Sequence, residues 1–233
     1  MARFVLVPGA WLGAWAWRDV AGHLENAGHS VYPVTLTGMG ERVHLARGDV
    51  GLETAILDVL NVIRYNEIDD VVLVGHSFAG KVAAGAADRV DPKVRKVIYL
   101  DAFRPERVTT PQGAFDPAAE FGPPPKGSLG IPLTREIISK IGKDVTGPTL
   151  QRMMALATPW PIKMATDPLG LSQNYERVKE AYIFCSQSGD PVEEIVAGKW
   201  GKLYGPHLII DTGHWPMLTK AEELAGQLVS LAK

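Results

Sequence analysis

The chain has 233 residues, 46% of them hydrophobic, and a formal net charge of −2, which suits one domain with a sizeable core. Near-neutral charge without a lysine and arginine cluster excludes the usual footprint of a nucleic-acid or membrane-surface binder and favours a small-molecule partner. The single cysteine, Cys185, excludes an intramolecular disulfide.

A strand-like run starts directly after Met1-Ala2-Arg3 and leaves no room for a signal peptide. No apolar run approaches the roughly 20 residues that cross a bilayer. We therefore expect a cytoplasmic protein that does not act at a membrane.

Short apolar runs alternate with helix-length segments through the first hundred residues. The expected strands are residues 4–7, 30–34, 71–74 and 96–100, and the helices expected between them are 17–27, 52–65 and 79–89. Such alternation is typical of βαβ units. It predicts the α/β class, with a mostly parallel sheet flanked by helices on both faces.

The alternation stops between residues 104 and 177, a stretch rich in Pro and Gly with helical patterns only near Ile137 and over 150–157. It resumes with strands at 181–185 and 207–210 and helices at 192–200 and 220–231. We interpret residues 104–177 as a helical lid, or cap, inserted into a single domain that spans residues 1–233.

The segment from Val71 to Gly80 leads a buried strand into a turn of small residues that carries Ser77. The order of strand, glycine, serine and Ala-rich helix is typical of a nucleophile elbow, where a strained turn exposes the serine Oγ. The usual G-x-S-x-G pattern has Ala79 at its last position here. Ser77 is the candidate nucleophile.

A serine hydroxyl needs a base within hydrogen-bond reach and a third group that orients the base. His214 follows the last expected strand in a loop with Gly213, and it is the best candidate base. For the acid we favour Asp190, after the strand that ends at Cys185, because the chain order is then Ser, Asp, His; Asp101 is the alternative. His76 is expected to point away from the site.

Acyl transfer also needs donors for a developing negative oxygen, commonly backbone N–H groups. We assign the N–H of Phe78, directly after the nucleophile, and that of Ala10, in the loop after the first strand. The lid and the loop of the base offer apolar residues for a substrate pocket, namely Phe103, Met153, Met154, Trp160 and Trp215. No metal-ligand spacing or phosphate-binding loop is visible, so no metal or cofactor is expected.

Several segments together resemble the α/β-hydrolase superfamily: residues 4–17, Gly28-His29, Gly75-His76-Ser77 and Gly213-His214. More narrowly, they are similar to the small esterase branch that includes plant methylesterases, plant hydroxynitrile lyases and bacterial aryl or carbamate esterases. That family usually has His-Gly where this chain has Pro8-Gly9. The resemblance implies an α/β-hydrolase fold and hydrolysis of small esters through an acyl-enzyme.

These residues and the resemblance leave three hypotheses about function. The leading hypothesis is a serine esterase with a Ser77, His214 and Asp190 triad, acting on a small apolar or aromatic carboxylic ester or carbamate. A hydroxynitrile-lyase-like or other lyase is the second, although the family's lyases use a threonine and a lysine where Gly9 and Trp215 stand here. The third is a small-molecule binding protein without turnover. The oligomeric state is left open.

Overall fold

The computed structural model describes residues 1–90, 93–102, 104–105, 116–199 and 202–233. Six parallel strands form one sheet in the order β2-β1-β3-β4-β5-β6. They are β1 (Arg3–Val7), β2 (Ser30–Pro33), β3 (Val71–His76), β4 (Val94–Leu100), β5 (Glu180–Cys185) and β6 (His207–Ile210). The predicted parallel sheet of an α/β fold is confirmed.

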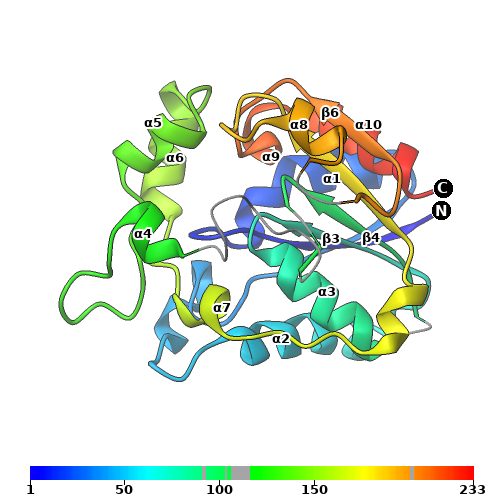
Figure 1. The fold of residues 1–233 in the computed structure, drawn as a ribbon, viewed down its shortest axis with the longest axis horizontal. Helices are drawn as coiled ribbons and strands as arrows, with labels where there is room; N and C mark the ends of the chain where they lie inside the picture. The colour runs from blue at the N-terminus through cyan, green and yellow to red at the C-terminus, as the bar shows by residue number, and fades with distance from the viewer. Residues whose placement is uncertain (91–92, 103, 106–115, 200–201) are drawn as a thin grey trace.

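Helices cover both faces of this sheet (Figure 1). On one face α1 (Arg18–Asn26) packs against α10 (Ala221–Leu231), and on the other α2 (Leu52–Tyr65) packs against α3 (Ala79–Val90). Burial on both faces explains why the central strand needs an uninterrupted apolar run, and residues 71–74 of β3 are indeed fully buried. No helix in the described ranges is long and apolar enough to cross a membrane.

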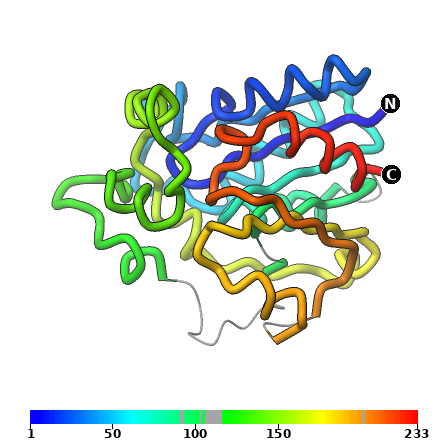
Figure 2. Tube along the Cα trace, turned by 90° about the horizontal axis from the view of Figure 1, so that it is seen from above, coloured from blue at the N-terminus to red at the C-terminus, as the bar shows by residue number. Residues whose placement is uncertain are grey.

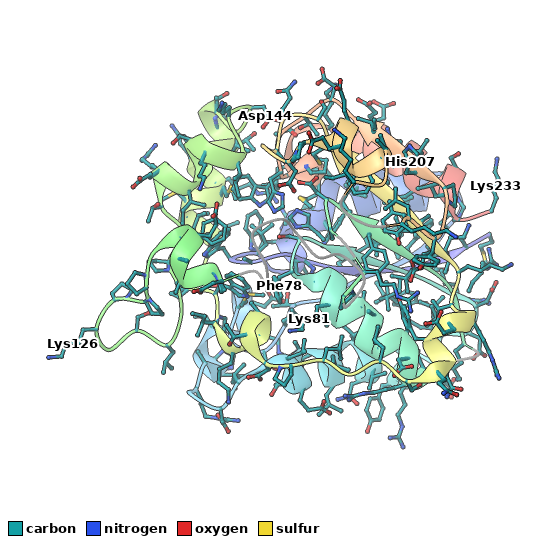
Figure 3. The ribbon with its side chains drawn as sticks, in the orientation of Figure 1. Phe78, Lys81, Lys126, Asp144, His207 and Lys233 are labelled. Carbon is teal, nitrogen blue, oxygen red and sulfur yellow. The ribbon has the colours of Figure 1, made fainter. Side chains whose placement is uncertain are left out.

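Between β4 and β5 the chain leaves the sheet, and we call residues 116–177 the insertion. It contains α4 (Pro117–Phe121), α5 (Arg135–Ile141), α6 (Gly147–Leu156), α7 (Lys163–Thr166) and the 3₁₀ helix η3 (Gln173–Arg177). Helices α4, α5 and α6 lie beyond the carboxyl ends of the strands (Figure 1), with Lys126 at the outer tip (Figure 3), and the segment after α7 returns along α2 and α3. Both termini of the chain lie at the opposite end of the molecule (Figure 2).

Three short elements that the periodicity did not predict also shape the fold: η1 (Ala14–Trp17), η2 (Gly40–Leu45) and α9 (Pro216–Thr219); a fourth is α8 (Val192–Val196). Helix α8 is shorter than the predicted 192–200. It ends because Gly198 adopts a φ of 78°, and the amides of Gly198 and Lys199 bond back to carbonyls of the last turn. Strand β3 runs two residues further than predicted, directly to Ser77.

Candidate active site

Ser77 lies on a sharp turn between β3 and α3. Its φ of 57° falls in the left-handed region that non-glycine residues rarely adopt. Gly75 makes the turn possible, because a Cβ atom there would lie 2.5 Å from the Ala79 carbonyl oxygen. The Ser77 N–H donates to the Leu100 carbonyl at 3.0 Å, which ties the turn to β4. The strand, strained turn and helix thus have the geometry of a nucleophile elbow.

Asp101 and His214 meet beside this turn. Asp101 directly follows β4, and its Oδ2 lies 2.6 Å from Nδ1 of His214. Its Oδ1 accepts the Cys185 N–H at 3.0 Å and the Ser188 hydroxyl at 3.4 Å. The Asp101 side chain is only 2% exposed and that of His214 14%. A buried carboxylate with these partners can orient a histidine and stabilise it as an imidazolium.

Of the two candidate acids, Asp101, the alternative, hydrogen-bonds to His214. No hydrogen bond joins Asp190, the favoured acid, to His214 within the described residues. β5 pairs with β4 so that Ile183 lies opposite Leu100, and the Asp101 N–H donates to the Ile183 carbonyl at 2.7 Å. This register places Asp101 at the carboxyl end of β4, next to the loop that carries His214. Asp190 lies further along the loop after β5 as an exposed residue, and its pKa is raised by desolvation and then by the nearby Asp101 charge.

His76, which the sequence analysis set aside, contacts two loops of the site. Its Nδ1 accepts the Gly9 N–H at 3.2 Å, and its Nε2 lies 2.7 Å from the His214 carbonyl oxygen. The ring is fully buried and its centroid is 4.7 Å from that of the His214 ring. The sequence signal for this residue was its position directly before the nucleophile.

The two amides expected to donate to the oxyanion belong to Ala10, in the loop after β1, and to Phe78, directly after Ser77. Gly9 follows β1 and lies against the elbow, because a Cβ there would be 3.0 Å from Cβ of Ser77 and 2.4 Å from Nδ1 of His76. The next residue, Ala10, and Phe78 are the two assigned donors. Within the described part of the chain, neither N–H donates a hydrogen bond to the protein. Both N–H groups can thus donate to an external oxygen.

Aromatic side chains from the first loop, the insertion and the base loop converge near the elbow. Trp11 makes edge contacts with Phe121, Trp160 and Trp215 at centroid distances of 5.3, 6.0 and 6.5 Å. Phe78 lies 4.9 Å from Trp160. These contacts make the surroundings of the site apolar and aromatic.

The predicted pocket residues differ in burial. Met153, Trp160 and Trp215 are at most 1% exposed and belong to the core, whereas Met154 is half-buried. Phe103 lies outside the described residues. Of this set, Trp160 and Trp215 take part in the aromatic cluster around Trp11.

The insertion is bonded directly to the loop of His214. The His214 N–H donates to the Ile141 carbonyl at 2.8 Å, and Asp144 accepts the Gly213 N–H at 3.0 Å and the Thr212 hydroxyl through the same oxygen. Asp144 lies on the side of the insertion that faces this loop (Figure 3). The position of the histidine thus depends on a segment far from it in sequence.

Cys185 offers no rival nucleophile. Burial, reinforced by the nearby Asp101 charge, raises the pKa of its thiol well above the usual value. The reactive thiolate is therefore disfavoured at neutral pH. Serine chemistry is what the arrangement supports.

Comparison with known proteins identifies the family. A model described as the alpha/beta hydrolase family matches residues 4–227, so the chain belongs to this family and the resemblance is confirmed. Methylesterase 10 of Arabidopsis thaliana is 30% identical over 258 residues, which cover 99% of this chain and 91% of that protein.

Two further relatives are informative at different levels. The carbendazim hydrolyzing esterase of Nocardioides sp. (strain SG-4G) is 57% identical over 106 residues, but these cover only 46% of this chain and 44% of that protein. The solved structure of an extracellular α/β-hydrolase from a Paenibacillus species has a TM-score of 0.83 at 21% identity, over 99% of both chains. At that identity the likeness shows the fold alone.

Proposed function

We propose that this protein is a carboxylic-ester hydrolase that works through an acyl-enzyme on Ser77. Esterases and methylesterases are its named relatives, which supports this class of enzyme. The single observation that carries the serine mechanism is the 2.6 Å contact between Asp101 and His214 beside the strained Ser77 turn. Nucleophile, base and orienting acid come from the ends of β3, β6 and β4.

In the proposed reaction Ser77 Oγ attacks the carbonyl carbon while His214 Nε2 takes the hydroxyl proton. Asp101 stabilises the imidazolium through Nδ1–H, and the amides of Ala10 and Phe78 donate to the oxyanion. Collapse of the tetrahedral intermediate breaks the bond to the leaving group, which departs with the proton from His214. Water then attacks the acyl-enzyme with His214 as base, and this releases the acid and restores Ser77.

For the substrate we propose a small molecule with an apolar or aromatic part, with the insertion as the lid. The aromatic cluster around Trp11 supports this class, because aromatic side chains favour aromatic ligands by stacking and burial. Carbamates belong to the same proposal, since one relative is named for hydrolysing carbendazim and the tetrahedral chemistry is shared.

The test is hydrolysis of a panel of p-nitrophenyl, aryl, methyl and carbamate esters by the parent and by Ser77→Ala. We expect Ser77→Ala to lower kcat by at least about 10³-fold. Ser139→Ala removes the same atom on exposed α5 and serves as the matched control with unchanged kcat. A fluorophosphonate should add one adduct to the parent and none to Ser77→Ala.

Other outcomes would decide against the proposal. Ester hydrolysis that survives in Ser77→Ala contradicts the serine mechanism. Cleavage of a cyanohydrin without ester hydrolysis favours the lyase, and ligand binding without turnover of any acyl substrate favours the binding protein. Equal rates on acetate and aryl esters would contradict the preference for aromatic substrates.

A further inference from the structure

We propose that His76 is a positioning residue that holds the oxyanion loop and the base loop in register with Ser77. The inference rests on the function proposed above and adds a role for a residue outside the triad. His76 is the last residue of β3, adjacent to the nucleophile in the chain. Its ring is the one side chain in the described ranges that bonds both to the loop before Ala10 and to the loop of His214.

The two partners define the protonation of the ring. A backbone N–H can only donate, so Nδ1 of His76 must carry a lone pair toward Gly9. A carbonyl can only accept, so Nε2 must carry the proton toward the His214 oxygen. Both bonds therefore require the neutral Nε2–H tautomer. Burial supports this state, because it holds the pKa of His76 well below its usual range.

The strand register explains why one ring reaches both loops. Val7 of β1 pairs with Gly75 of β3, so Gly9 lies alongside the residues that follow Gly75. A Cβ atom at Gly9 would be 2.4 Å from Nδ1 of His76, which shows how closely the loop approaches the ring. On the other side the rings of His76 and His214 are 4.7 Å apart.

The two hydrogen bonds of the His76 ring, to Gly9 and to the His214 carbonyl, form what we call the His76 bridge. This bridge has a catalytic consequence. The Ala10 amide, which donates to the oxyanion in the proposed reaction, directly follows Gly9. Nε2 of His214 must reach Ser77, and His76 holds the His214 main chain. Misplacement of a reacting group by about 1 Å can cost about 10²-fold in rate. In this chain, where Pro8 precedes Gly9, His76 gives the first loop a fixed partner.

Substitutions of His76 can remove its hydrogen bond to Gly9 and its hydrogen bond to His214 separately. The side-chain oxygen of His76→Asn occupies the position of Nδ1 and keeps an acceptor for Gly9 but loses the donor to His214. The terminal nitrogen of His76→Gln occupies the position of Nε2 and keeps that donor but loses the acceptor. His76→Ala loses both. His29→Asn is the matched control, because Nδ1 of His29 likewise accepts a backbone N–H, from Ala2 at 3.0 Å, at the other end of the sheet.

We expect kcat for a p-nitrophenyl ester to fall about tenfold in the Asn and Gln variants and about 10²-fold in His76→Ala. KM should change less than about threefold, because the substrate contacts are left intact. His29→Asn should keep the parent kcat. Melting temperatures of all variants show whether the smaller kcat loss in the Asn and Gln variants, compared with His76→Ala, reflects the kept contact or a difference in the amount of folded protein.

Nitrogen NMR of the histidine rings in the parent tests the bridge without any assay of turnover. One ring should remain in the neutral Nε2–H form at a pH where exposed histidines are cationic. A His76 ring protonated on Nδ1, or kcat within about twofold of the parent in all three variants, would overturn the proposal while ester hydrolysis stands. If the parent hydrolyses no ester, the proposed function fails, and with it the catalytic role of His76, whereas the NMR spectrum still decides whether the bridge exists.

Discussion

Asp101 shows how one carboxylate can be fixed in direction by its neighbours. One oxygen accepts the Cys185 N–H and the Ser188 hydroxyl, which leaves the other for Nδ1 of His214. Its backbone φ of 44° turns the chain out of β4 at this point. Hydrogen bonds to a charged group are worth about 1.5–3 kcal/mol each, so rotation of this carboxylate away from His214 is costly.

Exchange of the two candidate acids for amides tests the assignment at the level of single residues. Asp101→Asn should lower kcat by about 10³- to 10⁴-fold, because an amide there favours the wrong histidine tautomer. Asp190→Asn makes the same change on an exposed side chain and should leave kcat within about twofold of the parent. Steady-state kinetics on one p-nitrophenyl ester measure both. A larger loss in Asp190→Asn than in Asp101→Asn would restore the original assignment.

The sequence contains both acids at suitable places, and its pattern favoured Asp190, whereas the structure brings Asp101 to His214. Each acid follows a strand, and the chain order Ser, Asp, His favours Asp190. The choice depends on the register between β4 and β5 and on the left-handed turn at Asp101, neither of which has a periodic signal. The proposals for Ser77 and His214 depend less on register, because a glycine-flanked elbow and a Gly-His loop are local patterns.

At the scale of elements, the insertion and the base loop form one bonded unit. Asp144 belongs to the turn between α5 and α6, and a single oxygen of its carboxylate accepts from Thr212 and Gly213. A Cβ atom at Gly213 would lie 2.3 Å from the other Asp144 oxygen, so the loop needs a glycine at this contact. The insertion therefore holds the loop of His214 through these hydrogen bonds.

Removal of the Asp144 carboxylate should loosen this unit. We expect Asp144→Ala to lower the free energy of unfolding by about 1–3 kcal/mol, because it leaves the Gly213 amide and the Thr212 hydroxyl without their acceptor. kcat should fall about tenfold as His214 gains freedom. Asp144→Asn retains an acceptor oxygen, so its stability and kcat should lie between those of the parent and of Asp144→Ala. Chemical denaturation and kinetics provide the measurements.

Asp116→Ala is the control within the same segment. Its carboxylate caps α4 by accepting the Ala118 N–H at 2.9 Å, on the exposed side of the insertion. Its loss should cost about 1 kcal/mol of helix capping and no kcat. If Asp144→Ala behaved like Asp116→Ala, the insertion would not support the base.

The elements themselves were largely predictable, and the exceptions share a cause. Strands buried on both faces and long amphipathic helices carry a strong periodic signal, so the sheet and helices α1, α2, α3 and α10 were found. Within the insertion, α4 and α7 span only five and four residues, less than one and a half turns. Helices this short are fixed by tertiary contacts, which a sequence pattern does not contain.

At the scale of the whole molecule, the buried His76 links stability to pH, with a smaller effect from the partly exposed His29. Burial lowers the pKa of His76, and to a lesser degree that of His29, below the ordinary value of 6.5. Between the folded and unfolded pKa values the unfolded chain binds a proton that the folded protein does not, so the free energy of unfolding falls as pH decreases. The full contribution of both histidines is present above pH 6.5.

We therefore expect the free energy of unfolding to fall between about pH 6.5 and pH 5.5, by up to about 1.4 kcal/mol per pH unit for each proton. His76→Gln removes the group with the larger shift, so its stability should vary less over this range. Urea unfolding at several pH values gives the two slopes. Equal slopes in parent and variant would contradict the contribution of His76.

The hydrogen bonds that surround the elbow also predict how its backbone moves on long timescales. The amide of Ser77 donates to β4 and that of Asp101 to β5, whereas the amide of Phe78 has no acceptor in the described part of the chain. Amides within the central ladder exchange with deuterium only when large parts of a protein open. Ser77 and Asp101 should thus exchange orders of magnitude more slowly than Phe78, although Phe78 is the neighbour of Ser77.

Comparable exchange at Ser77 and Phe78 would contradict this expectation. If it holds, the groups that must keep a fixed position are locked by the most persistent part of the fold. The amide that must meet a transient charge is left accessible one residue away. Within a single turn, a slowly exchanging amide at Ser77 would then be followed by a fast-exchanging one at Phe78. Exchange rates measured without any substrate would show this difference.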